Sequence, residues 1–325
     1  MATEEAGSPT GSGPDGQTST AASPEVITVQ PGEEWILYQD DQVKASLVRP
    51  DGTGVHSPTL GLPGGGQTNP DWSPDGQRIA LIMADDDGTE DLWVVDVDGA
   101  NAERILDCAD PCRNVDDPSW MPDGQSIIYS RNAFDPSGAL GLGTLEVVQV
   151  ATGDVEVMLG PESTTFFSGV RPAPDGSAAV VEVADRADPY AEVSGVTLSV
   201  VDLSTAAHAV TGITDPALFA ATADWSPDGT LITYSALAAA GDTSPDLFTI
   251  RPDGTETTQV TQLAANGGSA IHPTFTPDSA RVVFVADLGT GERGLAQIDL
   301  NGANLGPATS DGYRSGNHPR IRPAS

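Results

Sequence analysis

Lysine is almost absent from this sequence, and basic residues are few. Lys44 is the one lysine among 14 basic residues, which face 47 acidic residues and leave a formal net charge of −33. A charge of this sign repels nucleic-acid phosphates and anionic lipid headgroups, so neither is expected as a partner. It is compatible with a basic partner, with divalent cations or a saline environment, or with a solvated acidic surface that keeps a β-protein soluble.

Cysteines and long apolar runs are scarce as well. No stretch approaches the roughly 18 apolar residues of a membrane-spanning helix, so membrane insertion by this chain is not expected. Cys108 and Cys112 are too few ligands for a structural zinc site. A turn through Asp110 and Pro111 brings their Cβ atoms within bonding distance, which predicts a local disulfide in an oxidising compartment; two reduced loop cysteines are the alternative.

Residues 1–25 lack apolar periodicity and are rich in Gly, Ser, Thr and Pro, which predicts a disordered tether. They contain no basic and apolar signal-peptide regions. Because tethers of this kind often follow a lipid-anchored cysteine or a membrane span, we expect an extracytoplasmic protein: periplasmic, secreted or a cell-surface lipoprotein.

Glycine and proline, by contrast, are abundant, and a proline-containing motif recurs. The strongest copies are Trp-Ser-Pro-Asp-Gly at 72–76 and 225–229, and weaker copies continue to the last residues. The shared proline falls at Pro74, Pro122, Pro174, Pro227, Pro277 and Pro323, at intervals of 48, 52, 53, 50 and 46 residues. Intervals near fifty with a short β-motif are typical of a β-propeller.

Each motif is followed by three further strand signals and a tight Asp-Gly or Asn-Gly turn, which predicts four antiparallel strands in each blade. The carboxyl-terminal copy has no strands after it, whereas the amino-terminal segment holds strands two to four of a blade. Pairing them closes an all-β, six-bladed propeller at 26–325. The expected blades are 33–60 plus 317–325, 68–107, 116–160, 168–212, 221–263 and 271–310.

Within the motif, proline sets the first turn position and Asp-Gly tolerates the tight bend between strands one and two. We expect Trp72, Trp120, Trp225 and Phe275 to pack between neighbouring blades.

Trp-Ser-Pro-Asp-Gly, followed by an apolar strand and an Asp-Gly hairpin, resembles the WD40-like (PD40) repeats of TolB-type propellers. The resemblance covers about residues 30–325 and implies an envelope protein that binds other proteins. A tether here stands in place of the α/β domain that such proteins carry, and in this the sequence departs from the pattern of the Tol system. Propellers similar to this one, including oligogalacturonate lyases and those of prolyl oligopeptidases, use the central funnel for ligands.

The repeat places equivalent residues around one mouth of the channel. One set is Asn69, Asp117, Gly169, Thr222, His272 and His318; two residues onward lie Asp71, Ser119, Arg171, Asp224, Thr274 and Arg320. From these we select a ligand-binding site of Asn69, Asp117, Arg171, Asp224, His272, His318 and Arg320. Histidines, carboxylates and arginines in one ring suit an anion or a metal; a polar mouth filled by water is the alternative explanation. We expected binding on this face, because it carries the longer connections.

No nucleophile elbow, phosphate loop or zinc-protease helix is present. The acidic string 85–91 lacks the distal Glu of a calcium loop and favours a solvated hairpin; a bound calcium or other divalent cation is the alternative cofactor. We therefore expect a monomeric, non-enzymatic module that binds a protein, peptide or glycan. A lyase or hydrolase at the channel mouth, and the sensor domain of a membrane receptor, are the alternatives.

Overall fold

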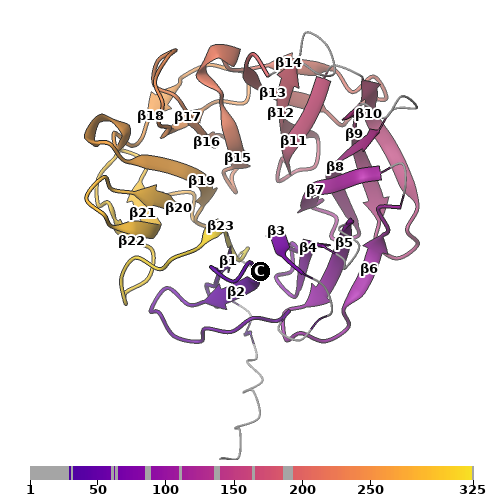
Figure 1. The fold of residues 1–325 in the computed structure, drawn as a ribbon, viewed down its shortest axis with the longest axis horizontal. Helices are drawn as coiled ribbons and strands as arrows, with labels where there is room; N and C mark the ends of the chain where they lie inside the picture. The colour runs from indigo at the N-terminus through magenta and orange to yellow at the C-terminus, as the bar shows by residue number, and fades with distance from the viewer. Residues whose placement is uncertain are drawn as a thin grey trace, which may run out of the picture.

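The computed structural model describes residues 29–30, 32–59, 62, 65–84, 89–109, 112–134, 140–162, 165–185 and 193–323. The predicted tether, the turn at Asp110 and Pro111 and the acidic residues 85–88 lie outside the described residues. Six sheets surround a central channel, and their strand order confirms a six-bladed propeller (Figure 1).

Five blades are four-stranded antiparallel sheets in simple up-and-down order. Blade 2 comprises β3 (Gln67–Trp72), β4 (Arg78–Ala84), β5 (Glu90–Asp96) and β6 (Glu103–Leu106). Blade 3 comprises β7 (Cys112–Trp120), β8 (Ser126–Phe134), β9 (Leu140–Gln149) and β10 (Val155–Glu162). Blade 4 comprises β11 (Thr165–Pro172), β12 (Ala178–Asp185), β13 (Val196–Asp202) and β14 (Val210–Gly212).

Blades 5 and 6 follow the same plan with shorter outer strands. Blade 5 comprises β15 (Ala221–Trp225), β16 (Ile232–Ala236), β17 (Asp246–Ile250) and β18 (Thr258–Gln259). Blade 6 comprises β19 (Ser269–Phe275), β20 (Arg281–Asp287), β21 (Arg293–Asp299) and β22 (Gly306–Pro307). The short 3-10 helices η1 (Pro216–Leu218) and η2 (Ala264–Asn266) precede blades 5 and 6.

Blade 1 is built from both ends of the chain, as the sequence predicts. β23 (Asn317–Ile321) is its inner strand and pairs with β1 (Ile36–Gln39), which pairs with β2 (Ala45–Val48). The fourth strand, expected within residues 33–60, is reduced to one bridge between Leu47 and His56. In Figure 1 the yellow β23 lies beside the indigo β1 and seals the ring.

The hydrophobic core lies between adjacent blades. Trp72 of blade 2 packs with Trp35 and Leu37 of blade 1, and Trp120 of blade 3 packs with Ile82 of blade 2. Trp225 and Phe275 make the same kind of contact with blades 4 and 5, respectively. The expected role of these aromatic residues is confirmed, and burying them between blades holds the inner strands at fixed positions around the channel.

Candidate functional site

Every inner strand carries a bulge at the same point. Its register shifts there, and one residue adopts a left-handed conformation: Asn69, Asp117, Gly169, Thr222, His272 and His318 have φ of 50°, 49°, 58°, 55°, 52° and 46°. We call these residues the first ring, and the residues two positions onward (Asp71, Ser119, Arg171, Asp224, Thr274, Arg320) the second ring. A bulge re-aims side chains, and here it turns both sets toward the channel.

The first ring nearly closes the channel. Asp117 Oδ2 accepts the Gly169 N–H of the next blade at 2.7 Å, and Thr222 Oγ1 accepts the His272 N–H at 3.2 Å. Asn69 donates to both Asp116 and Asp117. What remains is a narrow chamber of about 20 Å³, lined by Asp117, Gly169, Arg171, Glu182, Thr222, Ala223, His272, His318 and Arg320. That volume suits about one water molecule. The sequence predicts an open funnel at this end of the channel, whereas the structure has a small chamber there.

Glu182 is a member of this chamber that the sequence analysis missed, because it comes from the second strand of blade 4. Its Oε1 accepts the Thr222 N–H at 2.6 Å and its Oε2 accepts from Ser168 at 3.0 Å. A Cβ on Gly169 would lie 2.2 Å from Oε1, so the glycine leaves the space that Glu182 fills. The signal in the sequence is a glycine where the other five repeats carry a side chain.

The carboxyl groups of the chamber are strongly perturbed. Burial, aided by the negative charge of Asp117, raises the pKa of Glu182 to about 7. Burial and repulsion by Asp117 also raise the pKa of Asp116. These groups therefore change protonation near neutral pH.

His272 and His318, the two predicted histidines, are neighbours in the structure, and each packs against the other. Their rings stack with centroids 3.9 Å apart, and His272 Nδ1 lies 2.6 Å from Asn317 Oδ1. Burial lowers the pKa of both histidines, so both are neutral at pH 7. Within the described residues, no three His, Cys, Asp or Glu side chains converge as a metal site.

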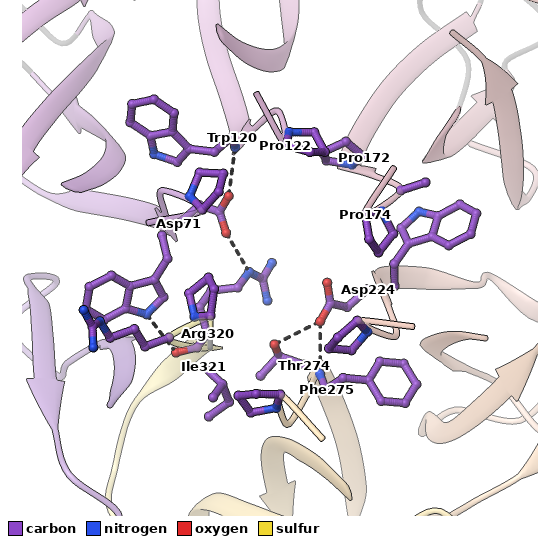
Figure 2. A pocket seen from close by; sticks show the side chains of 18 residues that line it. Asp71, Trp120, Pro122, Pro172, Pro174, Asp224, Thr274, Phe275, Arg320 and Ile321 are labelled. Atoms are coloured by element: carbon purple, nitrogen blue, oxygen red, sulfur yellow. Dashed lines mark hydrogen bonds and ion pairs between the residues drawn. The ribbon is translucent and has the colours of Figure 1, made fainter. Parts of the chain in front are cut away.

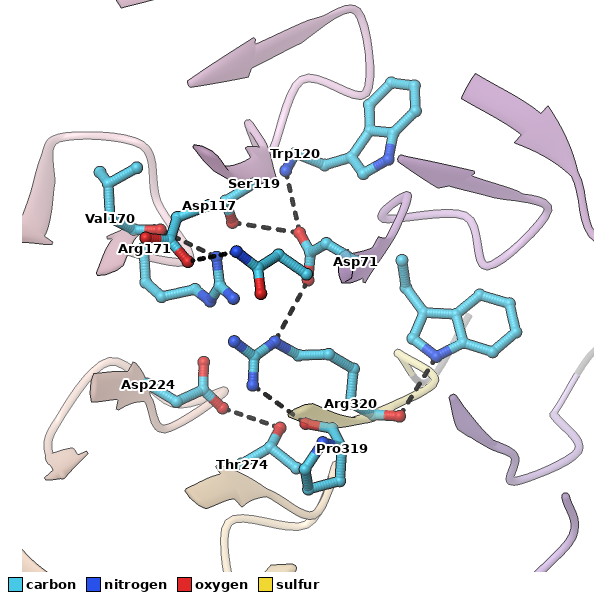
Figure 3. A network of polar contacts seen from close by, with 12 residues as sticks. Asp71, Asp117, Ser119, Trp120, Val170, Arg171, Asp224, Thr274, Pro319 and Arg320 are labelled. Atoms are coloured by element: carbon cyan, nitrogen blue, oxygen red, sulfur yellow. Dashed lines mark hydrogen bonds and ion pairs between the residues drawn. The ribbon is translucent and has the colours of Figure 1, made fainter. Parts of the chain in front are cut away.

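The second ring repeats one arrangement twice, on opposite sides of the channel (Figure 3). Asp71 Oδ2 accepts from Ser119 Oγ at 3.1 Å and from the Trp120 N–H at 3.0 Å; Asp224 Oδ2 accepts from Thr274 Oγ1 at 2.9 Å and from the Phe275 N–H at 3.0 Å. An arginine follows each pair, so the order carboxylate, hydroxyl, guanidinium occurs twice around the ring. The ring therefore has an approximate two-fold axis along the channel.

Arg171 and Arg320 occupy matching places. Each donates from Nη1 to the carbonyl of its own preceding residue at 2.9 Å, and the carbonyls of Arg320 and Arg171 accept from Trp72 and Trp225. Their exposed fractions are 5% and 9%, and the Nε of each has no hydrogen-bond partner. Arg320 Nε lies 3.7 Å from Asp71 Oδ1, which is an ion pair but too long for a hydrogen bond.

Beyond the second ring the channel widens into a cavity of about 510 Å³, which we call the wide mouth (Figure 2). Its floor includes Asp71, Asp224, Thr274 and Arg320. Its rim is apolar and is formed by the six motif prolines Pro74, Pro122, Pro174, Pro227, Pro277 and Pro323. Burial raises the pKa of Asp71, and it raises that of Asp224 to about 6. A concave cavity of this size with few polar groups is typical of a ligand site.

The wide mouth opens on the face of the Pro-Asp-Gly turns, opposite to the face on which we expected binding. On the expected face, the long connections 135–139 and 186–192 fall outside the described residues. A groove of about 530 Å³ lies there between residues 238–246 and 262–267. Its buried carboxylate, Asp246, is occupied by hydrogen bonds from Thr261 Oγ1 at 2.8 Å and the Leu263 N–H at 2.7 Å, which places it in the scaffold.

Two further predicted features lie away from the channel axis. Cys108 and Cys112 form a disulfide with Cα atoms 5.2 Å apart. Asp91, from the acidic string, is fully buried and accepts from the Cys108 N–H at 2.8 Å and from Arg104 at 3.0 Å. Asp91 therefore anchors the segment that carries the disulfide.

Comparison with known proteins agrees with this architecture. No family model matches the chain. TolB from Acinetobacter baumannii superposes with a TM-score of 0.67 at 17% identity, over 90% of this chain and 67% of that protein. An oligogalacturonate lyase in complex with manganese superposes with a TM-score of 0.54 at 18% identity, over 85% of this chain and 73% of that one.

A curated relative in Bacillus subtilis (strain 168), the uncharacterized peptidase YuxL, is 33% identical over 63 residues. The match covers 19% of this chain and 9% of that protein, a small part of its length. In the described part of the chain, no helix has the length and apolarity to span a membrane. Structural neighbours of this kind include both binding proteins and enzymes, so they establish fold without activity. The chain has the six-bladed propeller fold of TolB-like proteins.

Proposed function

We propose that this protein is a non-enzymatic, extracytoplasmic binding module that takes a segment of a partner polypeptide into the wide mouth of its channel. The observation that carries this proposal is the cavity of about 510 Å³, with an apolar proline rim and a polar floor. Rigid apolar walls around a few oriented polar groups are what a binding site for an extended chain requires. The Cys108–Cys112 disulfide supports a location in an oxidising compartment.

The arrangement of charged groups favours binding over catalysis. Among the described residues, the lining of the wide mouth includes neither histidine nor cysteine. The two channel histidines lie at the other end, stacked on each other in a chamber of about 20 Å³. A substrate held in the wide mouth is therefore remote from His272 and His318. Of the set that a lyase or hydrolase in this channel would use (His272, His318, Arg171 and Arg320), Arg320 alone lines the wide mouth, and a guanidinium stays protonated and is a poor general base.

A single introduced thiol tests the location of binding, because the described cysteines are both in the disulfide. Pro174 is exposed and lines the wide mouth, so the Pro174→Cys variant can be labelled there with a bulky maleimide. The matched control is the Thr255→Cys variant, labelled in an exposed outer turn on the same face. Peptides selected by the unmodified protein from a random decapeptide library should lose at least tenfold in affinity for the first labelled protein only. Equal affinity for both labelled proteins would contradict binding in the wide mouth.

A further inference from the structure

A ring of carboxylates surrounds the wide mouth outside the proline rim. Asp75, Asp123, Asp175, Asp228 and Asp278 follow five of the six prolines and are exposed. Hydrogen bonds from Ser177, Ser226 and Thr276 hold the pKa of Asp175, Asp228 and Asp278 below the usual range. These three carboxylates are therefore ionised at neutral pH, and we call the five aspartates together the acidic rim.

The floor of the same cavity carries a positively charged group that needs a hydrogen-bond acceptor. The side chain of Arg320 reaches into the middle of the wide mouth in Figure 2. It is 9% exposed; its Nη1 donates to the Pro319 carbonyl and its Nε is ion-paired with Asp71 at 3.7 Å, which leaves Nη2 for a ligand. A guanidinium N–H needs an acceptor when water is displaced from it, so an oxygen atom supplied by a ligand would be stabilising at Nη2.

A ligand that satisfies both regions needs positive charge at the rim and an uncharged oxygen acceptor at the floor. A free anion meets the second need but is repelled by the acidic rim and by the net charge of −33. A free metal ion meets the first need but brings no acceptor. A basic polypeptide meets both, because its backbone carbonyls are acceptors and its side chains carry the charge.

We propose that the wide mouth binds an extended, basic segment of a partner protein, with a backbone carbonyl on Arg320 and lysine or arginine side chains on the acidic rim. This inference rests on the proposed function and adds the chemistry of the partner. Attraction between rim and segment would chiefly raise the association rate and make binding sensitive to salt.

The test compares unlabelled decapeptides of alternating alanine and lysine, alanine and glutamine, or alanine and glutamate, by isothermal titration calorimetry at low and high salt. The rim variant carries Asp75→Asn, Asp175→Asn, Asp228→Asn and Asp278→Asn. Asparagine keeps the side-chain oxygen that accepts the turn N–H groups of Gln77, Ser177, Thr230 and Ala280.

A matched control removes the same charge from the outer turns of the same face, with Asp51→Asn, Asp98→Asn, Asp202→Asn and Asp253→Asn. These aspartates make the same local bonds, to the N–H groups of Thr53, Ala100, Ser204 and Thr255. We expect the lysine peptide to bind the rim variant about tenfold more weakly than the unmodified protein at low salt, and the control variant within about threefold. High salt should remove most of that difference.

Three other outcomes would each overturn part or all of these proposals. If lysine and glutamine peptides bind equally, and labelling of the Pro174→Cys variant blocks both, the basic character of the partner is overturned and the binding site stands. If the two Asn variants weaken the lysine peptide equally, attraction is to the whole acidic surface and the specific site is overturned. If no peptide is affected by the label at position 174, the proposed function itself fails.

Discussion

The two ends of the channel are built from the same six inner strands and yet differ in almost every property. At the first ring, side-chain oxygens accept N–H groups from the next blade, as Asp117 does from Gly169 and Glu182 does from Thr222. At the wide mouth the rim residue of each strand is proline, which has no N–H to offer. The first ring encloses a chamber of about 20 Å³, whereas the proline rim borders a cavity of about 510 Å³.

The comparison teaches that a repeated backbone does not fix the site. The same left-handed bulge occurs in all six blades. In both rings the side chains that it turns inward cross-link neighbouring blades, as Asp117 does at the narrow end and Asp71 does at the floor of the wide mouth. The two ends differ in the residues around these rings: two stacked histidines lie at one end, and six prolines border the other.

Substitution at the narrow end should be far more destabilising than at the rim. Gly169→Ala brings a Cβ to within 2.2 Å of Glu182 Oε1, and we expect a loss of about 2–3 kcal/mol in the free energy of unfolding. Pro174→Ala at the exposed rim should cost less than about 1 kcal/mol. Chemical denaturation measures both.

A double variant tests whether the contact with Glu182 causes this loss of stability. Combining Gly169→Ala with Glu182→Ala should cost less than the two single changes added together, because the second removes the atom that the first strikes. Strict additivity would show that Glu182 is not the cause of the loss.

Mild acidification should stabilise the folded protein, and stronger acidification should destabilise it. The folded protein holds the pKa of Glu182 at about 7 and that of Asp224 at about 6, both above their values in the unfolded chain. The folded state thus binds these protons more tightly, so the free energy of unfolding should rise as the pH falls from 8 to about 5.5, on the order of 1 kcal/mol for Glu182. Below pH 4 the lowered-pKa rim carboxylates protonate and stability should fall.

Repulsion among the acidic side chains also weakens as the pH falls over this range. The variant Glu182→Gln cannot titrate at position 182, so it separates the contribution of Glu182 from this general effect. Its stability should change less between pH 8 and 5.5 than that of the unmodified protein. Parallel curves for the two proteins would mean that Glu182 titrates normally.

Removal of the stacked histidines should have the smallest effect on binding. The double variant His272→Ala and His318→Ala alters the narrow chamber only, so library-selected peptides should bind the wide mouth within about twofold of their original affinity. Calorimetry checks this, with a thermal melt to verify folding. A tenfold loss would instead place the ligand at the histidine end and restore the expectation made from the sequence.

Much of the architecture was predictable because turn chemistry and apolar runs recur with the blade. The apolar run at 79–83, which predicts the second strand of its blade, is the core of β4 (Arg78–Ala84), and the Asp-Gly turn at Asp98 ends in a glycine with φ of 84°. Strand ends were less accessible to sequence reasoning. The apolar run at 127–129 predicts only the start of β8 (Ser126–Phe134), because backbone pairing with β9 continues through polar residues that carry no apolar signal.

The channel was predictable as two rings of equivalent positions, but its shape was not. Spacing along the chain places Asn69, Asp117, Arg171, Asp224, His272, His318 and Arg320 around one axis, and the structure gathers them there. Spacing along the chain does not reveal that Glu182 reaches the chamber from a second strand, or that the histidines stack rather than face a ligand. Those features depend on side-chain directions set by the bulge and on contacts between blades, which no single repeat encodes.

The pairing of β1 with β23 has a consequence for how the protein is made. While the ribosome is still translating blades 2 to 6, β1 already exists but its inner partner does not. Until residues 317–321 appear, that unpaired edge is a template for the wrong strand, in the same molecule or another. A protein sealed in this way gains from a chaperone, or from transport in an unfolded form, that keeps its early strands apart until the last one arrives.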